Sequence, residues 1–147
     1  TWYYQISENY LCEPVQHYGF YLTPLQNFEK GKTVFYPHGY SNYFFHPTHP
    51  HELIIVSTEN NKVSILNCLS GEIVRTISKG KEYAFCNIDP VTGNYLFRNS
   101  YYVLITNENG DELFRMRSED ASPYLANNIL TCWAGAAINV EPYLKKP

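Results

Sequence analysis

Two successive stretches between Asn42 and Arg117 carry the same order of apolar runs and turns. The first stretch opens at Phe45-His46-Pro47 and the second at Ile88-Asp89-Pro90. A repeat of roughly 40 residues is typical of architectures in which no single unit can bury its own apolar face. The sequence therefore predicts two equivalent repeat units within residues 40–117 of a single β-rich domain that spans residues 1–147.

The apolar runs have the length and composition of antiparallel strands. They lie at 53–56, 63–66 and 72–77 in the first unit, and at 95–97, 102–105 and 112–116 in the second. Asn109-Gly110 joins the last two runs, and this dipeptide is a strong β-hairpin signal. Aromatic residues, which favour sheet, make up 16% of the chain. These features predict an all-β antiparallel fold built of hairpin repeats.

The segments on either side of the repeat have different patterns. Residues 1–40 are interrupted by Pro and Gly and offer short strand candidates, while the stretch from Cys12 to Val15 contains Pro14 and is predicted to be a loop. Residues 120–135 are predicted to form one C-terminal helix. Asp120 or Ser122 could cap that helix, and Leu125, Ile129 and Trp133 recur at helical spacing.

The repeat resembles a WD40-type β-propeller blade. Phe45-His46-Pro47 corresponds to the corner before the second strand of a blade, and Ser70-Gly71-Glu72 to the turn before the fourth. The resemblance covers about half of the chain. The Trp-Asp and Gly-His signatures are missing, and Leu66-Asn67 stands at the Trp-Asp position. The resemblance implies propeller-like hairpin repeats and a role in protein interaction.

Two other all-β folds fit the length of the chain. Three units of about 45 residues would suit a β-trefoil. A lipocalin-like barrel followed by a helix is the other alternative, since Trp2-Tyr3 is similar to the opening strand of that family. A propeller needs at least four blades of ~40–45 residues, and this chain holds about three and a half. A propeller-like chain of this length would be a piece of a propeller or a half completed by a second copy.

Charge and hydropathy exclude several classes of partner. The net charge is −3 and no run of basic residues occurs, so nucleic acid is not expected. No apolar run reaches about 18 residues, so no membrane span is expected. The expected compartment is the cytoplasm, or the secretory route if Thr1 follows a removed signal peptide.

The four cysteines, Cys12, Cys68, Cys86 and Cys132, do not show metal-ligand spacing. An even number would allow two disulfides in a secreted protein. Buried thiols that behave as small apolar side chains are the favoured interpretation.

The densest group of possible metal ligands is His46-x-x-His49-x-His51, with Glu52 beside it. Imidazoles suit Zn, Ni or Cu. Pro47 and Pro50 make the segment a rigid corner, so a structural role is favoured and no metal site is predicted.

No catalytic residue or cofactor is predicted. Cys86 and Asp89 could form a nucleophilic site with His17 or His38, but no spacing singles them out. The carboxylate pairs Glu119-Asp120 and Asp111-Glu112 are interpreted as structural. The aromatic segment with Tyr36, Tyr40, Tyr43, Phe44 and Phe45 could line a sugar or peptide site, although packing is favoured.

The sequence thus favours a protein-interaction or scaffold module, a subunit of a larger complex. Because a short run of repeats leaves open strand edges, we expect a protein partner or a second copy to pair at one of them. The alternative is a barrel or trefoil that binds a small ligand or a carbohydrate.

Overall fold

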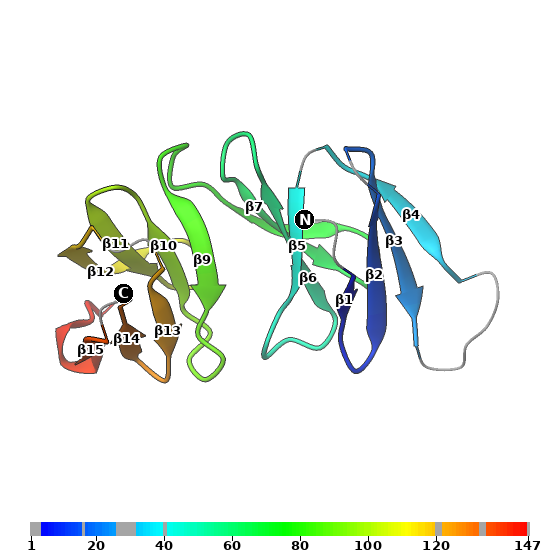
Figure 1. The fold of residues 1–147 in the computed structure, drawn as a ribbon. Coiled ribbons are helices and arrows are strands. Elements are labelled where there is room, and N and C mark those ends of the chain that lie inside the picture. The colour runs from blue at the N-terminus through cyan, green and yellow to red at the C-terminus, as the bar shows by residue number, and fades with distance from the viewer. Residues whose placement is uncertain are drawn as a thin grey trace. The chain divides into compact units, whose positions relative to one another are not determined.

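The computed structural model describes residues 4–15, 17–25, 32–39, 41–119, 122–132 and 135–146. In these residues the strands form four antiparallel sheets that follow one another along the chain (Figure 1). Strands that are consecutive in sequence are neighbours in each sheet, so every sheet is a simple meander. The all-β prediction is confirmed.

The first sheet contains β1 (Gln5–Ile6), β2 (Tyr10–Val15), β3 (Gly19–Pro24) and β4 (Val34–Pro37). The second contains β5 (Ser41–Phe45), β6 (Glu52–Ser57), β7 (Val63–Asn67) and β8 (Ile73–Ile77). The third contains β9 (Ala84–Ile88), β10 (Tyr95–Arg98), β11 (Tyr102–Thr106) and β12 (Glu112–Arg117). The last contains β13 (Tyr124–Ala126), β14 (Ile129–Thr131) and β15 (Ala137–Asn139), and a 3-10 turn, η1 (Glu141–Tyr143), follows it.

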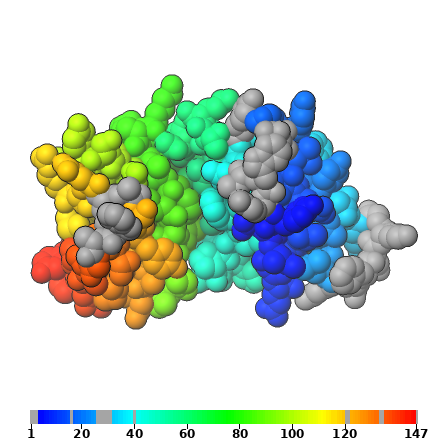
Figure 2. Space-filling view, in the orientation of Figure 1, coloured from blue at the N-terminus to red at the C-terminus, as the bar shows by residue number. Residues whose placement is uncertain are grey.

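The chain divides into two compact units, Thr1–Thr76 and Ile77–Pro147. Each unit has a core of its own, formed where alternate residues of its strands face the neighbouring sheet. The first core contains Tyr10, Cys12, Phe20, Leu22, Tyr43, Leu53, Ile55 and Leu66. The second contains Leu96, Val103, Ile105, Leu125, Leu130 and Val140. Figure 2 shows residues of the first sheet, in blue, packed directly against residues of the second sheet, in cyan.

Aromatic rings join the two sheets of the first unit. The Phe20 ring, on β3, lies 5.3 Å from the Tyr36 ring and 4.7 Å from the Tyr43 ring. Tyr10 stacks on Phe45 at 6.4 Å. Such ring pairs add stabilisation beyond the area they bury, so the high aromatic content of the chain is used in part to pack one sheet on the next.

The predicted helix over residues 120–135 is wrong wherever the structure describes that segment. Residues 124–126 and 129–131 form the hairpin β13–β14, in which Leu125 pairs with Leu130. Asn127 and Asn128, between the two strands, have φ of 51° and 61°, a left-handed conformation that a right-handed helix excludes and a tight hairpin turn requires. Trp133, which the helix would have placed on the sheet, lies outside the described residues.

The predicted loop from Cys12 to Val15 is also wrong, because these residues belong to β2. Pro14 pairs with Phe20 of β3. On the other side of β2, the described residues of the short strand β1 pair with Leu11 and Cys12. Pro14 therefore interrupts none of the strand pairs of the described residues on that side, which is the condition under which a strand tolerates proline.

The lipocalin-like and trefoil alternatives do not fit the sheet topology. The described strands are divided among separate sheets, each with two edge strands, and no closed barrel forms among them. Within the described residues, the last sheet has three strands and each of the others has four.

Candidate functional site

Two buried polar side chains stand at the equivalent proline corners of the two repeats. His46 Nδ1 accepts hydrogen bonds from the backbone N–H groups of Thr48 and His49, each at 3.1 Å. Asp89 Oδ1 accepts from the backbone N–H groups at the same two offsets, at 2.9 and 3.3 Å. A side-chain acceptor that satisfies these N–H groups fixes the turn. Histidine and aspartate thus serve the same structural purpose at equivalent positions.

The structure brings together three of the candidate metal ligands. His46, His49 and Glu52 each place a possible ligand atom within 4.8 Å of the others. His51 does not join them, because its Nδ1 shares a 2.8 Å hydrogen bond with the hydroxyl of Tyr10.

The chemistry of this group does not fit a metal site. Since Nδ1 of His46 accepts two N–H bonds, the neutral ring carries its proton on Nε2. A ligating histidine does the opposite, donating from its second nitrogen to an acceptor. Burial, with smaller contributions from His49 and Arg75, lowers the pKa of His46 to about 3. Arg75 also pairs with Glu52 at 2.7 Å and balances its charge. The three side chains therefore form a structural corner.

Cys86 and Asp89, the second-unit members of the candidate nucleophilic site, have structural surroundings. Burial raises the pKa of the Cys86 thiol to about 11, which disfavours the reactive thiolate. Asp89 is fully buried and bonds to backbone N–H groups. Its partners include Asn127 and Asn128 of the β13–β14 turn, at 2.8 and 2.9 Å. The carboxylate therefore holds a hairpin in place.

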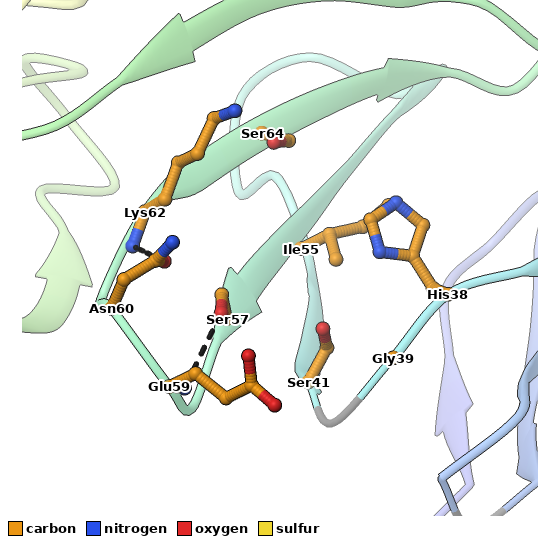
Figure 3. A pocket seen from close by; sticks show the side chains of 9 residues that line it. All are labelled: His38, Gly39, Ser41, Ile55, Ser57, Glu59, Asn60, Lys62 and Ser64. Carbon is orange, nitrogen blue, oxygen red and sulfur yellow. Dashed lines mark hydrogen bonds between the residues drawn. The ribbon is translucent and has the colours of Figure 1, made fainter.

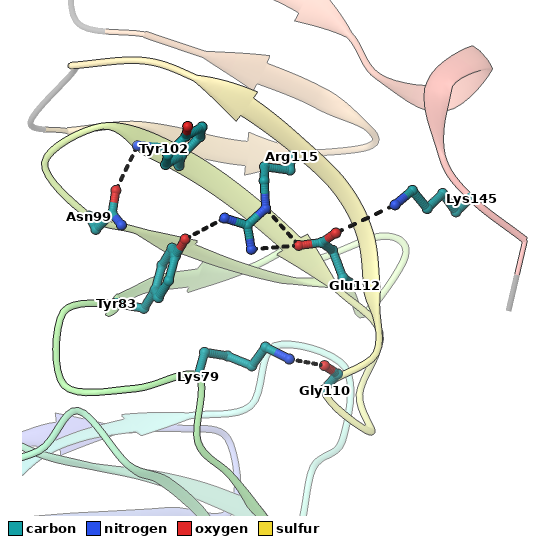
Figure 4. A network of polar contacts seen from close by, with 8 residues as sticks. All are labelled: Lys79, Tyr83, Asn99, Tyr102, Gly110, Glu112, Arg115 and Lys145. Carbon is teal, nitrogen blue, oxygen red and sulfur yellow. Dashed lines mark hydrogen bonds and ion pairs between the residues drawn. The ribbon is translucent and has the colours of Figure 1, made fainter.

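The carboxylates of the β11–β12 turn are held by neighbouring side chains. Asp111 Oδ2 accepts a 3.0 Å bond from Asn107. Glu112 pairs with Arg115 at 2.7 Å and with Lys145 at 3.5 Å (Figure 4). The hydrogen bond from Arg115 is the main reason why the pKa of Glu112 is lowered. Of the other predicted carboxylate pair, Glu119 is exposed and Asp120 lies outside the described residues.

The guanidinium of Arg115 is the centre of the same network. It lies 5.6 Å from the centroid of the Tyr83 ring and 5.3 Å from that of Tyr102. Its Nη1 donates a 2.6 Å bond to the Tyr83 hydroxyl (Figure 4). These contacts are intramolecular and give both Arg115 and Glu112 partners within the protein.

The aromatic segment is divided between core and surface. Tyr36, Tyr43 and Phe45 pack in or against the first core, and Phe44, on the opposite face of β5, is 37% exposed. Tyr40 lies outside the described residues. The described residues of this segment therefore do not present one aromatic surface to a ligand.

A different aromatic pair is exposed on the first sheet. Tyr21 of β3 and Phe35 of β4 face each other across the strands, with ring centroids 5.1 Å apart. They are 44% and 41% exposed, on the face of the sheet opposite to Phe20 and Leu22. Ile6, on the same face of β1, is 71% exposed. The register places Glu13, which pairs with Tyr21, on this face as well. We call its exposed apolar residues Ile6, Tyr21 and Phe35 the outer apolar face.

A polar pocket of about 240 Å³ lies at one end of the second sheet (Figure 3). Three serines line it, Ser41, Ser57 and Ser64, one from each of β5, β6 and β7. Its other polar residues are His38, which precedes β5, and Glu59, Asn60 and Lys62 of the β6–β7 turn, while Ile55 is its buried apolar residue. Sequence reasoning missed this pocket, because its residues come from separate segments. The sequence does contain one signal of this pocket: Ser64 is a polar residue on the face of β7 that also carries Leu66.

The fold resembles that of solved β-propellers. BamB from Moraxella catarrhalis superposes with a TM-score of 0.61 at 17% identity, over 88% of this chain and 38% of that one. The β-propeller domain of Cps50 (Swd1) from Myceliophteria thermophila gives 0.60 at 12% identity, over 88% of this chain and 47% of that one. The chain thus spans less than half the length of these two proteins.

One similar structure has nearly the length of this chain. The computationally designed protein Ika4 superposes with a TM-score of 0.60 at 10% identity, over 92% of this chain and 86% of that one. No protein-family model and no curated protein matches the sequence. Among the described residues, no helix has the length and apolar character needed to cross a membrane. At such low identities the likeness concerns the fold alone: the chain is all-β with propeller-like sheets.

Proposed function

We propose that the chain is a protein-interaction module of WD40-like type that binds a second copy of itself. The outer apolar face carries this proposal. Its residues lie on a sheet whose opposite face buries Phe20 and Leu22 against the second sheet of the same unit. The chain therefore already contains sheet faces suited to packing on one another, and face-to-face packing of sheets is the way in which propeller blades bury apolar residues.

The edge of the same sheet supports the proposal. β4 is an edge strand, bonded to β3 on one side only among the described residues. An incoming strand that pairs with β4 would bring its own side chains beside Phe35. The net charge of −3 opposes the approach of a second copy only weakly. Pairing at this open edge and burial of the outer apolar face belong to one interface.

The WD40-like assignment rests on the corner at Phe45-His46-Pro47 and the turn at Ser70-Gly71-Glu72. In the structure, His46 caps the corner, and Asn67 Oδ1 accepts backbone N–H bonds from Leu69 and Ser70 at the turn. Both motifs thus hold connections of a meander sheet, the role that the resemblance implies for them.

Sedimentation velocity across a range of protein concentrations tests the self-association. We expect the wild-type chain to form a dimer. Phe35→Ser and Tyr21→Ser should each weaken it more than tenfold, because removing a central aromatic side chain from an interface costs about 2 kcal/mol or more. Tyr143→Ser is the matched control, since Tyr143 is 66% exposed on η1 and is not one of the residues of the outer apolar face.

Two results would count against the proposal. A wild-type chain that stays monomeric at every concentration would exclude the second copy as partner. A dimer that Tyr143→Ser weakens as much as Phe35→Ser would show that the interface lies elsewhere. Circular dichroism of each variant checks that the exposed substitutions leave the sheets intact.

A further inference from the structure

The polar pocket interrupts an otherwise apolar sheet face. Along β5, the residues that face the first core change from Phe45 and Tyr43 to Ser41. On β6, Ile55 gives way to Ser57, which pairs with Ser41. The same replacement on β7 puts Ser64 beside Leu66. Three neighbouring strands thus change from apolar to hydroxyl side chains at the same end of the sheet.

The hydroxyl groups of the pocket are largely unused by the protein. Ser57 Oγ accepts a 3.3 Å bond from the backbone N–H of Glu59. Ser41 and Ser64 are half-buried, and neither hydroxyl has a hydrogen-bond partner within the part of the chain that the structure describes. An apolar residue at either position would extend the core, so the two hydroxyls do not serve packing.

The charged groups of the pocket are also available to bind a ligand. Glu59 and Lys62 flank the β6–β7 turn, and their charged ends point in different directions in Figure 3. Among the described residues, neither side chain takes part in an ion pair. His38 adds no charge near neutral pH, because burial, and secondarily Lys62, lowers its pKa. The pocket therefore offers one carboxylate, one ammonium group and three hydroxyls.

These groups restrict the ligand. The carboxylate of Glu59 repels an inorganic anion, and the ammonium group of Lys62 repels a metal cation. A volume of about 240 Å³ far exceeds the ~10–15 Å³ that one water molecule needs, so a small solute fits. A molecule with a positive and a negative group would satisfy both charges, and the serines could bond to either group.

We propose that this pocket binds a small zwitterion of the amino-acid class, with the ligand ammonium at Glu59 and the ligand carboxylate at Lys62. The site lies within the first unit. It does not depend on the outer apolar face, so the two proposals can fail separately.

Amide chemical-shift perturbation by NMR, with the free L-amino acids added one at a time to the full chain, tests the site. We expect at least one amino acid to bind saturably and to shift the amides of Ser41, Ser57 and Ser64. Its N-acetyl derivative lacks the ammonium group and its amide derivative lacks the carboxylate, so each should bind more than tenfold more weakly. The proposal is overturned if no amino acid binds at concentrations of about ten millimolar, or if both derivatives bind as well as the parent.

Substitutions of the two charged pocket residues test where the ligand binds. Glu59→Gln and Lys62→Met should each weaken binding more than tenfold. Glu72→Gln and Lys81→Met are the controls, because both side chains are exposed and lie outside the pocket lining. Exposed turn positions tolerate such changes, so all four variants should fold. Undiminished binding by Glu59→Gln and Lys62→Met would place the ligand elsewhere and refute the site.

Discussion

His46 and Asp89 show how one structural need is met by two residue types. Each precedes a proline, and each accepts N–H bonds from the residues two and three positions further on. An imidazole can do this only when neutral, because protonation removes the lone pair of Nδ1. A carboxylate does it best when charged. The two corners should therefore respond differently to pH.

Protonation of His46 should destabilise the chain as the pH falls. Its folded pKa, about 3, lies below the unfolded value near 6.5, so its stabilising effect is complete above pH 6.5 and is lost as the pH falls from there toward 3. The stability difference between wild type and His46→Asn should change by up to about 1.4 kcal/mol per pH unit over that range. Urea unfolding of both proteins at a series of pH values measures it.

A second histidine variant controls for general effects of acid. His17 is exposed and has a φ of 65°, a left-handed conformation that asparagine tolerates. His17→Asn should follow the pH dependence of the wild type. If His46→Asn does so too, the buried imidazole is not the group that titrates.

At the scale of elements, the β13–β14 hairpin is held to the third sheet by two side chains. Asn87 donates from its side chain to the carbonyl of Leu125 at 2.9 Å and accepts from the N–H of the same residue at 3.1 Å. Asp89 binds the turn residues Asn127 and Asn128. Because Leu125 and Leu130 are fully buried beneath this hairpin, these bonds fix the position of core residues.

Asp89→Asn should destabilise the chain by about 2–4 kcal/mol, because an amide in place of the carboxylate puts a donor among backbone N–H groups and leaves some of them unpaired. Chemical denaturation measures the loss, and amide hydrogen exchange at Leu125 and Leu130 should accelerate. Asp111→Asn, in an exposed turn, should change stability by no more than about 0.5 kcal/mol. Equal effects of the two substitutions would contradict the role given to Asp89.

The elements differ in how far local sequence determines them. The strands and turns around Asn109-Gly110 carry signals within a few residues, and the strands of β10 to β12 lie where those signals place them. The helix prediction for the last segment fails because Leu125 and Ile129 are four residues apart, a spacing that suits a helix although the segment forms a hairpin. The decisive signal was Asn127-Asn128, since asparagine is among the few residues that tolerate a left-handed turn.

The candidate site is harder to predict from the sequence than the strands are, because its residues are brought together only by the tertiary structure. The structural corner at His46 can be predicted from the sequence, because Pro47 and the neighbouring histidines lie together in the chain. The outer apolar face cannot, because Ile6, Tyr21 and Phe35 come from three strands whose register the sequence does not specify. The same holds for the serines of the pocket, each of which belongs to a different strand.

At the scale of the whole molecule, charge and apolar surface make opposite contributions to association. The net charge of −3 gives two copies a weak mutual repulsion that salt screens. The outer apolar face attracts through burial, which salts such as sulfate strengthen. The dimer proposed above should therefore persist or tighten when the salt concentration rises. An interface made of ion pairs would weaken instead.

Sedimentation equilibrium in low and high sodium chloride, and then in sodium sulfate, distinguishes these cases. We expect the dissociation constant to stay constant or fall from the first condition to the last, and Phe35→Ser to remain the weaker associator in all three. Dissociation of the dimer in high salt would indicate that charged groups, and not the outer apolar face, form the interface. Because Phe35→Ser leaves the net charge unchanged, it separates the contribution of the apolar face from that of overall charge.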